Sequence, residues 1–262
     1  MPEYKLCVVR PTGHHSECPD IGTWIMDWAY GMHRYPEITA INNFQVANCR
    51  VSYMRNRAVA HAQGIGATHC LMLDPDMVID RFVERDAQFR PVGRYKPFWD
   101  VAWPFMKANP GSILGVPYCG MYPERPLHVF TRNHEDKLVR VDHQTAMGLE
   151  GWTQVAACGT GMMLIDMRVF DRLEKPYFDD VYKARDHCDL KFTQDVTFCL
   201  KAGGAGVPVY VNWDCPAGHW QNTVVDPPWL EKRRPAEQPI PLAKNPSVPA
   251  LVMQGAGDRS WQ

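Results

Sequence analysis

The chain has 262 residues, which is enough for one large domain or two small ones. Its 45% hydrophobic content allows a sizeable core and excludes a disordered chain, and its net charge of -1 excludes a global attraction to nucleic acid or anionic membranes. We find neither a signal peptide nor an apolar run of about 18 residues, so we expect no membrane partner. Nine scattered cysteines are typical of reduced thiols, and we expect a cytoplasmic protein.

The first half of the chain alternates apolar runs with helical patterns. The expected strands cover residues 4–10, 37–43 and 69–73, and the expected helices cover residues 23–33 and 50–63. A polar loop over residues 13–21 separates the first strand from the first helix. This alternation predicts a parallel sheet with helices on its faces.

The second half is more varied and ends in a Pro-rich segment that begins at Pro227. Its expected strands cover residues 112–117, 153–157, 161–166 and 207–212, its expected helices cover residues 97–108, 167–173 and 194–202, and residues 127–132 and 137–142 can pair as a hairpin. We therefore predict an α/β fold with a mixed, mainly parallel central sheet flanked by helices, a small antiparallel hairpin and an irregular C-terminal tail. The expected boundaries are 1–222 for the main domain and 223–262 for the tail.

The strand pattern over residues 69–73 ends in two carboxylates, Asp74 and Asp76, which flank Pro75. Ligands of open α/β sheets gather at the carboxyl ends of strands, and side chains two apart in an extended chain point the same way. Two close carboxylates repel each other unless a cation compensates, and a divalent ion shared with substrate phosphates is the simplest compensation. The alternative is a plain turn, because Asp and Pro both favour turns.

Two further motifs follow later in the chain. Gly159 and Gly161, on either side of Thr160, either let the backbone approach a ligand closely or form a tight turn between strands. Asp195 lies in the first turn of an expected helix with Thr193 as a candidate N-cap, where the helix dipole favours an ionised carboxylate. Such a carboxylate is either a general base or an ordinary complement of the dipole.

Two basic groups complete the set of candidates. His219 follows the last strand, and its imidazole is either a ligand for an ion such as Mn²⁺ or a surface side chain. Arg55 lies on the helix before the Asp strand, where its guanidinium either meets a phosphate as a fork or belongs to a solvated helix face.

Four stretches have to be considered together: MRNRAVAHAQGIGATHCLMLDPDM, GTGMMLIDMRVFDRLEKPYF, TQDVTFCLKAGGAGVPVYV and GHW. In this order they resemble a GT-A glycosyltransferase of the family-2-like type. The similarity covers roughly residues 4–222 and is strongest over residues 55–77 and 155–220. In that family an Asp-x-Asp motif holds a divalent metal on the diphosphate of a nucleotide sugar. The resemblance thus implies metal-dependent transfer of a sugar from a nucleoside-diphosphate sugar, with a UDP-sugar favoured, to an acceptor hydroxyl.

The resemblance also implies individual roles. The metal, Mn²⁺ in preference to Mg²⁺, would be held by Asp74, Asp76 and His219, and Asp195 would deprotonate the acceptor. Gln194 replaces the carboxylate that usually precedes this base, and retaining members lack such a base, so inversion and retention both stay open. The donor-binding residues implied in this way are Arg10, Pro11, Thr12, Arg55, Asp74, Pro75, Gly159, Thr160, Gly161 and Trp220.

The acceptor is open between a glycan, a small molecule and DNA with hydroxymethylated bases. Stand-alone proteins that resemble this chain include phage-type enzymes that glycosylate such DNA and act in the host cytoplasm. Residues 80–96 interleave basic and aromatic side chains, which suits nucleic acid or sugars but also suits a solvated amphipathic helix. The side chains concerned are Arg81, Phe82, Arg85, Phe89, Arg90, Arg94, Tyr95 and Lys96, and residues 232–234 add a basic run.

Three rival functions are weighed against this one. A metal-dependent nucleotidyltransferase would need a Gly-rich phosphate loop after the first strand, which is missing. A zinc site could use His15 with Cys18 or Cys215 with His219, but no Cys-x-x-Cys pair supports it. A non-catalytic nucleotide- or sugar-binding module would have a decayed site, whereas the candidate residues above are intact.

Overall fold

A computed structural model describes residues 3–12, 18–47, 50–120, 124–182, 190–220 and 224–225. These residues all belong to one of the two compact units of the chain, Met1–Lys232. The predicted tail, apart from residues 224–225, lies outside the described residues, as do residues 13–17 of the predicted polar loop. The boundary at residue 222 stays a prediction. Among the described helices, none has the length and apolar character needed to cross a bilayer.

The central sheet has seven strands: β1 (Tyr4–Thr12), β2 (Ile38–Ala47), β3 (His69–Leu73), β7 (Ile113–Gly115), β10 (Trp152–Val155), β12 (Met162–Asp166) and β15 (Val209–Asn212). Their order in the sheet is β10-β15-β7-β12-β3-β1-β2. β1 is parallel to β2 and β3, and β15 is parallel to β7, while β12 and β10 run against their neighbours. The predicted mixed, mainly parallel sheet is therefore confirmed.

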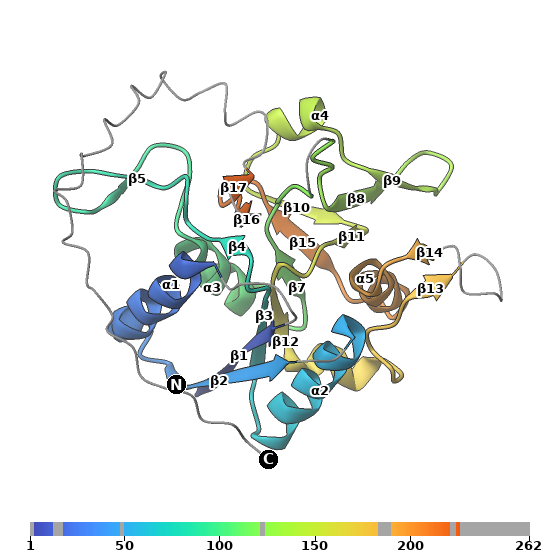
Figure 1. Ribbon diagram of the computed structural model, residues 1–262, viewed down its shortest axis with the longest axis horizontal. Helices are drawn as coiled ribbons and strands as arrows, with labels where there is room; N and C mark the ends of the chain where they lie inside the picture. Colours follow the sequence, from blue (N-terminus) through green and yellow to red (C-terminus); the bar gives the residue numbers. More distant parts are fainter. Residues whose placement is uncertain are drawn as a thin grey trace, which may run out of the picture. The chain divides into compact units, whose positions relative to one another are not determined.

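Four helices cover the sheet: α1 (Pro19–Tyr30), α2 (Val51–Gly64), α3 (Phe98–Ala108) and α5 (Gln194–Gly204). Alternate side chains of β3 enter two separate cores, because successive residues of a strand point to opposite faces. Leu71 and Leu73 pack with α1 and α3, whereas Cys70 and Met72 pack with α2 and α5. Figure 1 shows α1 and α3 on one side of the sheet and α2 and α5 on the other.

The smaller elements are η1 (Gly31–Arg34), β4 (Met77–Val78), β8 (Val129–Arg132), β9 (Leu138–Arg140), α4 (His143–Met147), β11 (Ala157–Cys158), η2 (Met167–Arg172), β13 (Val181–Tyr182), β14 (Leu190–Phe192), β16 (Gly218–Trp220) and β17 (Val224–Val225). The predicted hairpin is confirmed as β8 and β9, to which β11 adds a third strand. The short helix predicted over residues 167–173 is the 3-10 helix η2. α1 begins earlier than predicted, because Pro19 at its start suits the first turn of a helix.

The amphipathic helix considered for residues 80–96 is wrong. The segment instead contains an antiparallel pair, β5 (Glu84–Arg85) and β6 (Pro91–Val92). Asp80 and Phe89 adopt φ angles of 55° and 59°, which a right-handed helix does not allow. Pro91 also lacks the backbone N–H that a helix interior needs.

Candidate active site

The Asp-Pro-Asp segment follows β3 directly, at the carboxyl edge of the parallel strands. The N–H of Asp74 donates to the carbonyl of Gly161 at 2.8 Å, and the N–H of Met77 donates to the carbonyl of Asp74 at 3.2 Å. The carbonyl of the buried Pro75 accepts the N–H of Cys18, just before α1, at 2.6 Å. The segment is therefore a turn, as the plain alternative supposed, but one that is fixed on both sides by the backbone.

Arg55 of α2 holds the first carboxylate. Its Nη2 lies 2.7 and 2.8 Å from the two carboxylate oxygens of Asp74. Arg55 is 2% exposed, so the solvated helix face considered for it is wrong. Its Nε and Nη1 are buried and have no hydrogen-bond partner among the described residues. Buried donors of this kind are normally satisfied, so the Arg55 guanidinium retains capacity for an anionic ligand.

The second carboxylate, Asp76, faces His219. Its Oδ2 lies 3.0 Å from His219 Nε2, and the other ring nitrogen, Nδ1, lies 3.0 Å from the carbonyl of Cys119. β4 and β16 produce this meeting, because His219 pairs with Met77 and the N–H of Trp220 donates to the carbonyl of Asp76. Burial lowers the pKa of His219, but the hydrogen bond and charge of Asp76 outweigh it, and the net pKa is raised.

Asp195 lies beside the Arg55–Asp74 pair. Both line a cavity of about 430 Å³, together with Arg50, Val51, His128, Asp180, Thr193 and Gln194. Asp195 Oδ1 accepts hydrogen bonds from the Thr193 hydroxyl and from the Val196 N–H, and Asp180 accepts the N–H of Gln194 at 3.0 Å. Thr193 occupies the N-cap position as predicted, but its side chain does not cap the helix.

The charged side chains at this edge of the sheet affect the pKa of Asp74. Burial raises the pKa of Asp74, Arg55 lowers it, and the charges of Asp76 and Asp195 raise it again, so that the net pKa lies above its usual value. Three carboxylates thus share one guanidinium and one imidazole. This excess of negative charge favours binding of a cation.

The glycine motif packs against Tyr118, which follows β7. A Cβ atom on Gly159 would lie 2.1 Å from the Tyr118 hydroxyl, and a Cβ on Gly161 would lie 2.8 Å from Cζ of the same ring. The Gly161 N–H also donates to that hydroxyl at 3.1 Å. Close approach of an aromatic ring therefore accounts for both glycines, and contact with a donor stays a prediction. Thr160 is buried, and its hydroxyl has no partner among the described residues.

The remaining predicted donor residues lie along the same edge or beside it. Arg10, Pro11 and Thr12 form the last part of β1, beyond its pairing with β3, where the missing N–H of proline is tolerated. Arg10 Nε donates to Asn43 of β2 at 3.2 Å. Trp220 ends β16, next to His219.

No group of three or more His, Cys, Asp and Glu side chains is arranged to hold a metal within the described ranges. Of the three predicted metal ligands, Asp76 and His219 contact each other, and Asp74 is engaged by Arg55. Of the residues considered for zinc, His15 lies outside the described part, while Cys18 and Cys215 are buried free thiols.

Three further residues at the candidate site were not predicted from the sequence. Tyr118 and His128 stack with ring centroids 5.1 Å apart, and His128 lines the cavity of Asp195. Burial lowers the pKa of His128, which opposes its protonation. Asp180 fixes the start of α5. The rule that residues just after a strand line the site would have pointed to Tyr118, whereas nothing local marks His128 or Asp180.

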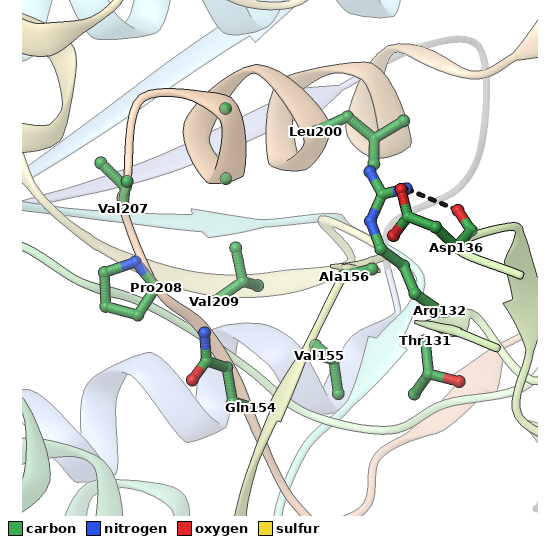
Figure 2. A pocket seen from close by; sticks show the side chains of 13 residues that line it. Thr131, Arg132, Asp136, Gln154, Val155, Ala156, Leu200, Val207, Pro208 and Val209 are labelled. Atoms are coloured by element: carbon green, nitrogen blue, oxygen red, sulfur yellow. Dashed lines mark hydrogen bonds and ion pairs between the residues drawn. The ribbon is translucent and has the colours of Figure 1, made fainter. Parts of the chain in front are cut away.

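A larger hollow, of about 880 Å³, lies between the end of α5, β10 and the β8–β9 hairpin. Figure 2 shows Arg132 and Asp136 facing each other across one side of it, with Val155, Pro208 and Val209 along the floor. Arg132 and Asp136 are an ion pair at 3.3 Å. The hollow lacks the clustered carboxylates and histidines of the sheet edge, so we place the candidate active site at Asp74, Asp76, Asp195 and His219.

Comparisons with known proteins agree with the fold. No protein-family model matches the sequence, and no curated protein sequence matches it. The structure is similar to A197 from STIV, with a TM-score of 0.53 and 16% identity over 85% of this chain and 90% of that one. At this identity the likeness shows a shared fold alone.

Two further solved structures match with lower scores. GalNAc-T7 with UDP, GalNAc and Mn²⁺ has a TM-score of 0.43 and 10% identity over 84% of this chain and 46% of that one. Apo UDP-glucose pyrophosphorylase has a TM-score of 0.37 and 8% identity over 82% and 74%. At these scores neither match carries an argument about the activity of this chain.

Proposed function

We propose that the protein is a metal-dependent glycosyltransferase that moves a sugar from a nucleoside-diphosphate sugar, with UDP as the favoured nucleotide, to an acceptor hydroxyl. The observation that carries the proposal is the meeting of Asp76 with His219, which are 143 positions apart in the chain, next to Asp74, which lines a cavity with Asp195. A carboxylate and an imidazole are suitable ligands for a divalent cation, and phosphate oxygens of the donor would complete its coordination shell.

The residues present fit such a cation. The carbonyl of Cys119 takes the Nδ1 side of His219, which fixes the ring and leaves Nε2 directed at Asp76. Asp76 and His219 would hold the ion, and Mn²⁺ fits this oxygen and nitrogen pair better than Mg²⁺ does. When bound, the ion would neutralise the charge of the leaving diphosphate.

The side chains around the cation have distinct tasks in this proposal. Arg55 holds Asp74 in place and offers to a phosphate its Nε and Nη1, which have no partner in the described part of the chain. Asp195 takes the proton of the acceptor hydroxyl, whose oxygen then forms the bond to the anomeric carbon while the sugar–phosphate bond breaks. The electrons of that bond leave with the nucleoside diphosphate. Both described hydrogen bonds of Asp195 fall on Oδ1, which leaves Oδ2 for the proton.

Thermal unfolding with UDP, GDP, CMP and dTDP, each with and without Mn²⁺, tests the site. A nucleotide at about 100 times its Kd stabilises the native state by about 2.7 kcal/mol, which raises the Tm by several degrees. We expect a rise that requires Mn²⁺ in the wild type and in the control Asp136→Ala, and no such rise in Asp76→Ala. The absence of any metal-dependent rise, or an equal rise in Asp76→Ala, contradicts the proposal.

Product analysis separates the rival activities. A glycosyltransferase given a nucleotide sugar and Mn²⁺ releases the nucleoside diphosphate. A nucleotidyltransferase supplied with pyrophosphate releases a nucleoside triphosphate and a sugar phosphate instead. A binding module releases neither, although it still shows the thermal shift.

A further inference from the structure

A second pocket, which the proposed reaction does not use, lies between α1, the start of α3 and the chain that follows β4. Its volume is about 640 Å³. Residues from all three segments line it, among them Asp20, Trp24, Asp27, Trp28, Trp99 and Asp100. Figure 1 shows α1 and α3 side by side, with the segment of β5 extending from the same side of the molecule. We call this site the tryptophan pocket.

Three stacked indole rings form one wall of the tryptophan pocket. Trp28 and Trp99 lie 4.1 Å apart at 11°, and Trp24 lies 6.3 Å from Trp28 at 19°. Trp28 and Trp99 are buried, whereas Trp24 is half-buried. The Trp24 indole N–H donates to Asp80 at 2.9 Å, which prevents the ring from turning. The wall is therefore a flat, rigid aromatic surface with one ring partly open to the pocket.

Hydrogen-bond acceptors and hydrogen-bond donors both lie around this wall. Asp20 and Asp27 of α1 line the pocket, and Asp100 of α3 accepts a hydrogen bond from the Tyr35 hydroxyl at 3.0 Å. The indole N–H groups of Trp28 and Trp99 are buried and have no partner in the described part of the chain. Because buried N–H groups are normally satisfied, these two donors are a second indication that the pocket takes a ligand.

The charges of the lining favour a neutral ligand. Four carboxylates and three guanidinium groups line the pocket, so neither a phosphate nor a cation finds a field of one sign. The charged lining residues are Asp20, Asp27, Asp80, Asp100, Arg34, Arg81 and Arg85.

The neighbouring hairpin also argues against nucleic acid. Arg85 donates to the carbonyl of Phe89 at 3.0 Å, and Arg90 pairs with Asp86 at 2.7 Å. Arg94 donates to the carbonyl of Leu149 at 2.5 Å. Three of the basic side chains that suggested DNA from the sequence are therefore engaged within the protein, one of them by a carboxylate.

A polyhydroxylated ring combines the features that remain. The C–H-rich face of a pyranose packs on the partly open indole of Trp24, and its hydroxyl groups donate to the carboxylates around the wall. A purely apolar ligand would leave the carboxylates of Asp20, Asp27 and Asp100 desolvated, which is costly.

We propose that the tryptophan pocket binds a neutral saccharide. Its wall includes Val78, the second residue after Asp76, and α1 begins just after Cys18, which bonds to Pro75. The pocket thus joins the candidate active site through the same segment of chain. Binding of the saccharide is independent of the transfer reaction, but its use as the acceptor site rests on the proposed function.

Binding to the full chain tests the proposal. The probes are short neutral oligosaccharides of glucose, galactose, mannose and N-acetylglucosamine, printed as an array and then titrated in solution. We expect binding to the wild type, and binding weaker by about tenfold or more in Trp24→Ala. The matched control is Trp152→Ala, which removes a half-buried ring stacked on Phe105 outside the pocket, and it should bind as the wild type does.

Further variants and probes make the result decisive. Asp27→Ala alters an exposed lining residue and is expected to weaken binding even if Trp24→Ala fails to fold. Binding of neutral saccharides by none of the proteins, equal binding by Asp27→Ala and wild type, or preferred binding of choline or single-stranded DNA overturns the proposal. Saccharide binding with no metal-dependent nucleotide shift supports this pocket while contradicting the proposed function, so the two failures are distinguishable.

Discussion

β3 carries a buried charge cluster at each of its two ends, and the clusters differ in how fully their hydrogen bonds are satisfied. At the amino end, Asp166 accepts the N–H of Gly111 at 2.8 Å and two hydrogen bonds from Arg168 at its other oxygen. His69 lies 3.9 Å from Asp166 and is held by Thr68 at 3.0 Å. The polar groups of this end find partners within the protein.

At the carboxyl end, several buried polar atoms have no partner among the residues that the structure describes. Nε and Nη1 of Arg55, the amide oxygen of Gln194 and the hydroxyl of Thr160 belong to this group. A cavity lined by carboxylates and His128 lies beside them. Both clusters adjoin a hollow, of about 430 Å³ at the carboxyl end and of about 710 Å³ beside His69 and Asp166, so the contrast lies in the hydrogen bonds alone. It favours a stabilising role for the amino-end cluster and a ligand-binding role for the carboxyl-end cluster, because an orphaned buried group is costly unless a ligand satisfies it.

The largest expected difference between the two ends of β3 is the effect of Asp195→Asn on the rate of transfer. The amide keeps the volume of the side chain but cannot take a proton, so we expect transfer to slow by about 10³-fold. The Mn²⁺-dependent thermal shift with nucleotide should persist, because Asp195 lies outside the cation pair. Steady-state release of nucleoside diphosphate measures the effect, and full activity in this variant would remove Asp195 as the base.

At the amino end of β3, we expect Asp166→Ala to lower the stability of the fold and to leave ligand binding unchanged, and this effect is smaller than that of Asp195→Asn. Asp166 is 1% exposed, and its loss leaves the partly buried N–H of Gly111 without its partner and frees Arg168, so we expect about 2 kcal/mol less stability in urea unfolding. The metal-dependent nucleotide shift should be unchanged. Asp171→Ala, at an exposed position nearby, is the control. A variant as stable as the wild type would show that the amino-end cluster does not stabilise the fold.

The smallest effect concerns pH. Burial lowers the pKa of His69 from 6.5 to about 4, so the folded protein takes up this proton at lower pH than the unfolded chain. Stability from this group is complete above pH 6.5 and is lost as the pH falls toward 4, by about 2 kcal/mol between pH 6.5 and 5. Urea unfolding across this range should show a shallower slope in His69→Gln, and an identical slope would contradict the assignment.

Local patterns were sufficient to predict most of the fold. Residues 69–73 formed β3 as expected, because His69 and the four apolar residues after it make a run of strand length, preceded by Gly64 and Gly66 and ended by Asp74 and Pro75. Residues 80–96 were harder, since their mixed composition fits a helix and a hairpin equally well. There the backbone conformations of Asp80 and Phe89 decide the outcome, and composition does not reveal them.

The sequence named Asp74, Asp76, Asp195 and His219 as candidates, but it missed Tyr118, His128 and Asp180 and did not reveal which side chains would meet. Asp76 and His219 were each expected to bind the metal, yet only the pairing of β4 with β16 brings them together. The partner of Arg55 is Asp74, although the sequence suggested a phosphate. Such contacts depend on register between distant segments, which periodicity within one segment does not specify.

The separation of 143 positions between Asp76 and His219 also imposes an order in time. During synthesis, β1, β2 and β3 can pair long before His219 leaves the ribosome, because contacts between distant residues form late. A ribosome that stops before residue 218 therefore releases a chain with the first sheet strands but without the Asp76–His219 pair. Any chemistry that depends on the pair can begin only when translation has passed β16, so a chain that terminates earlier lacks it.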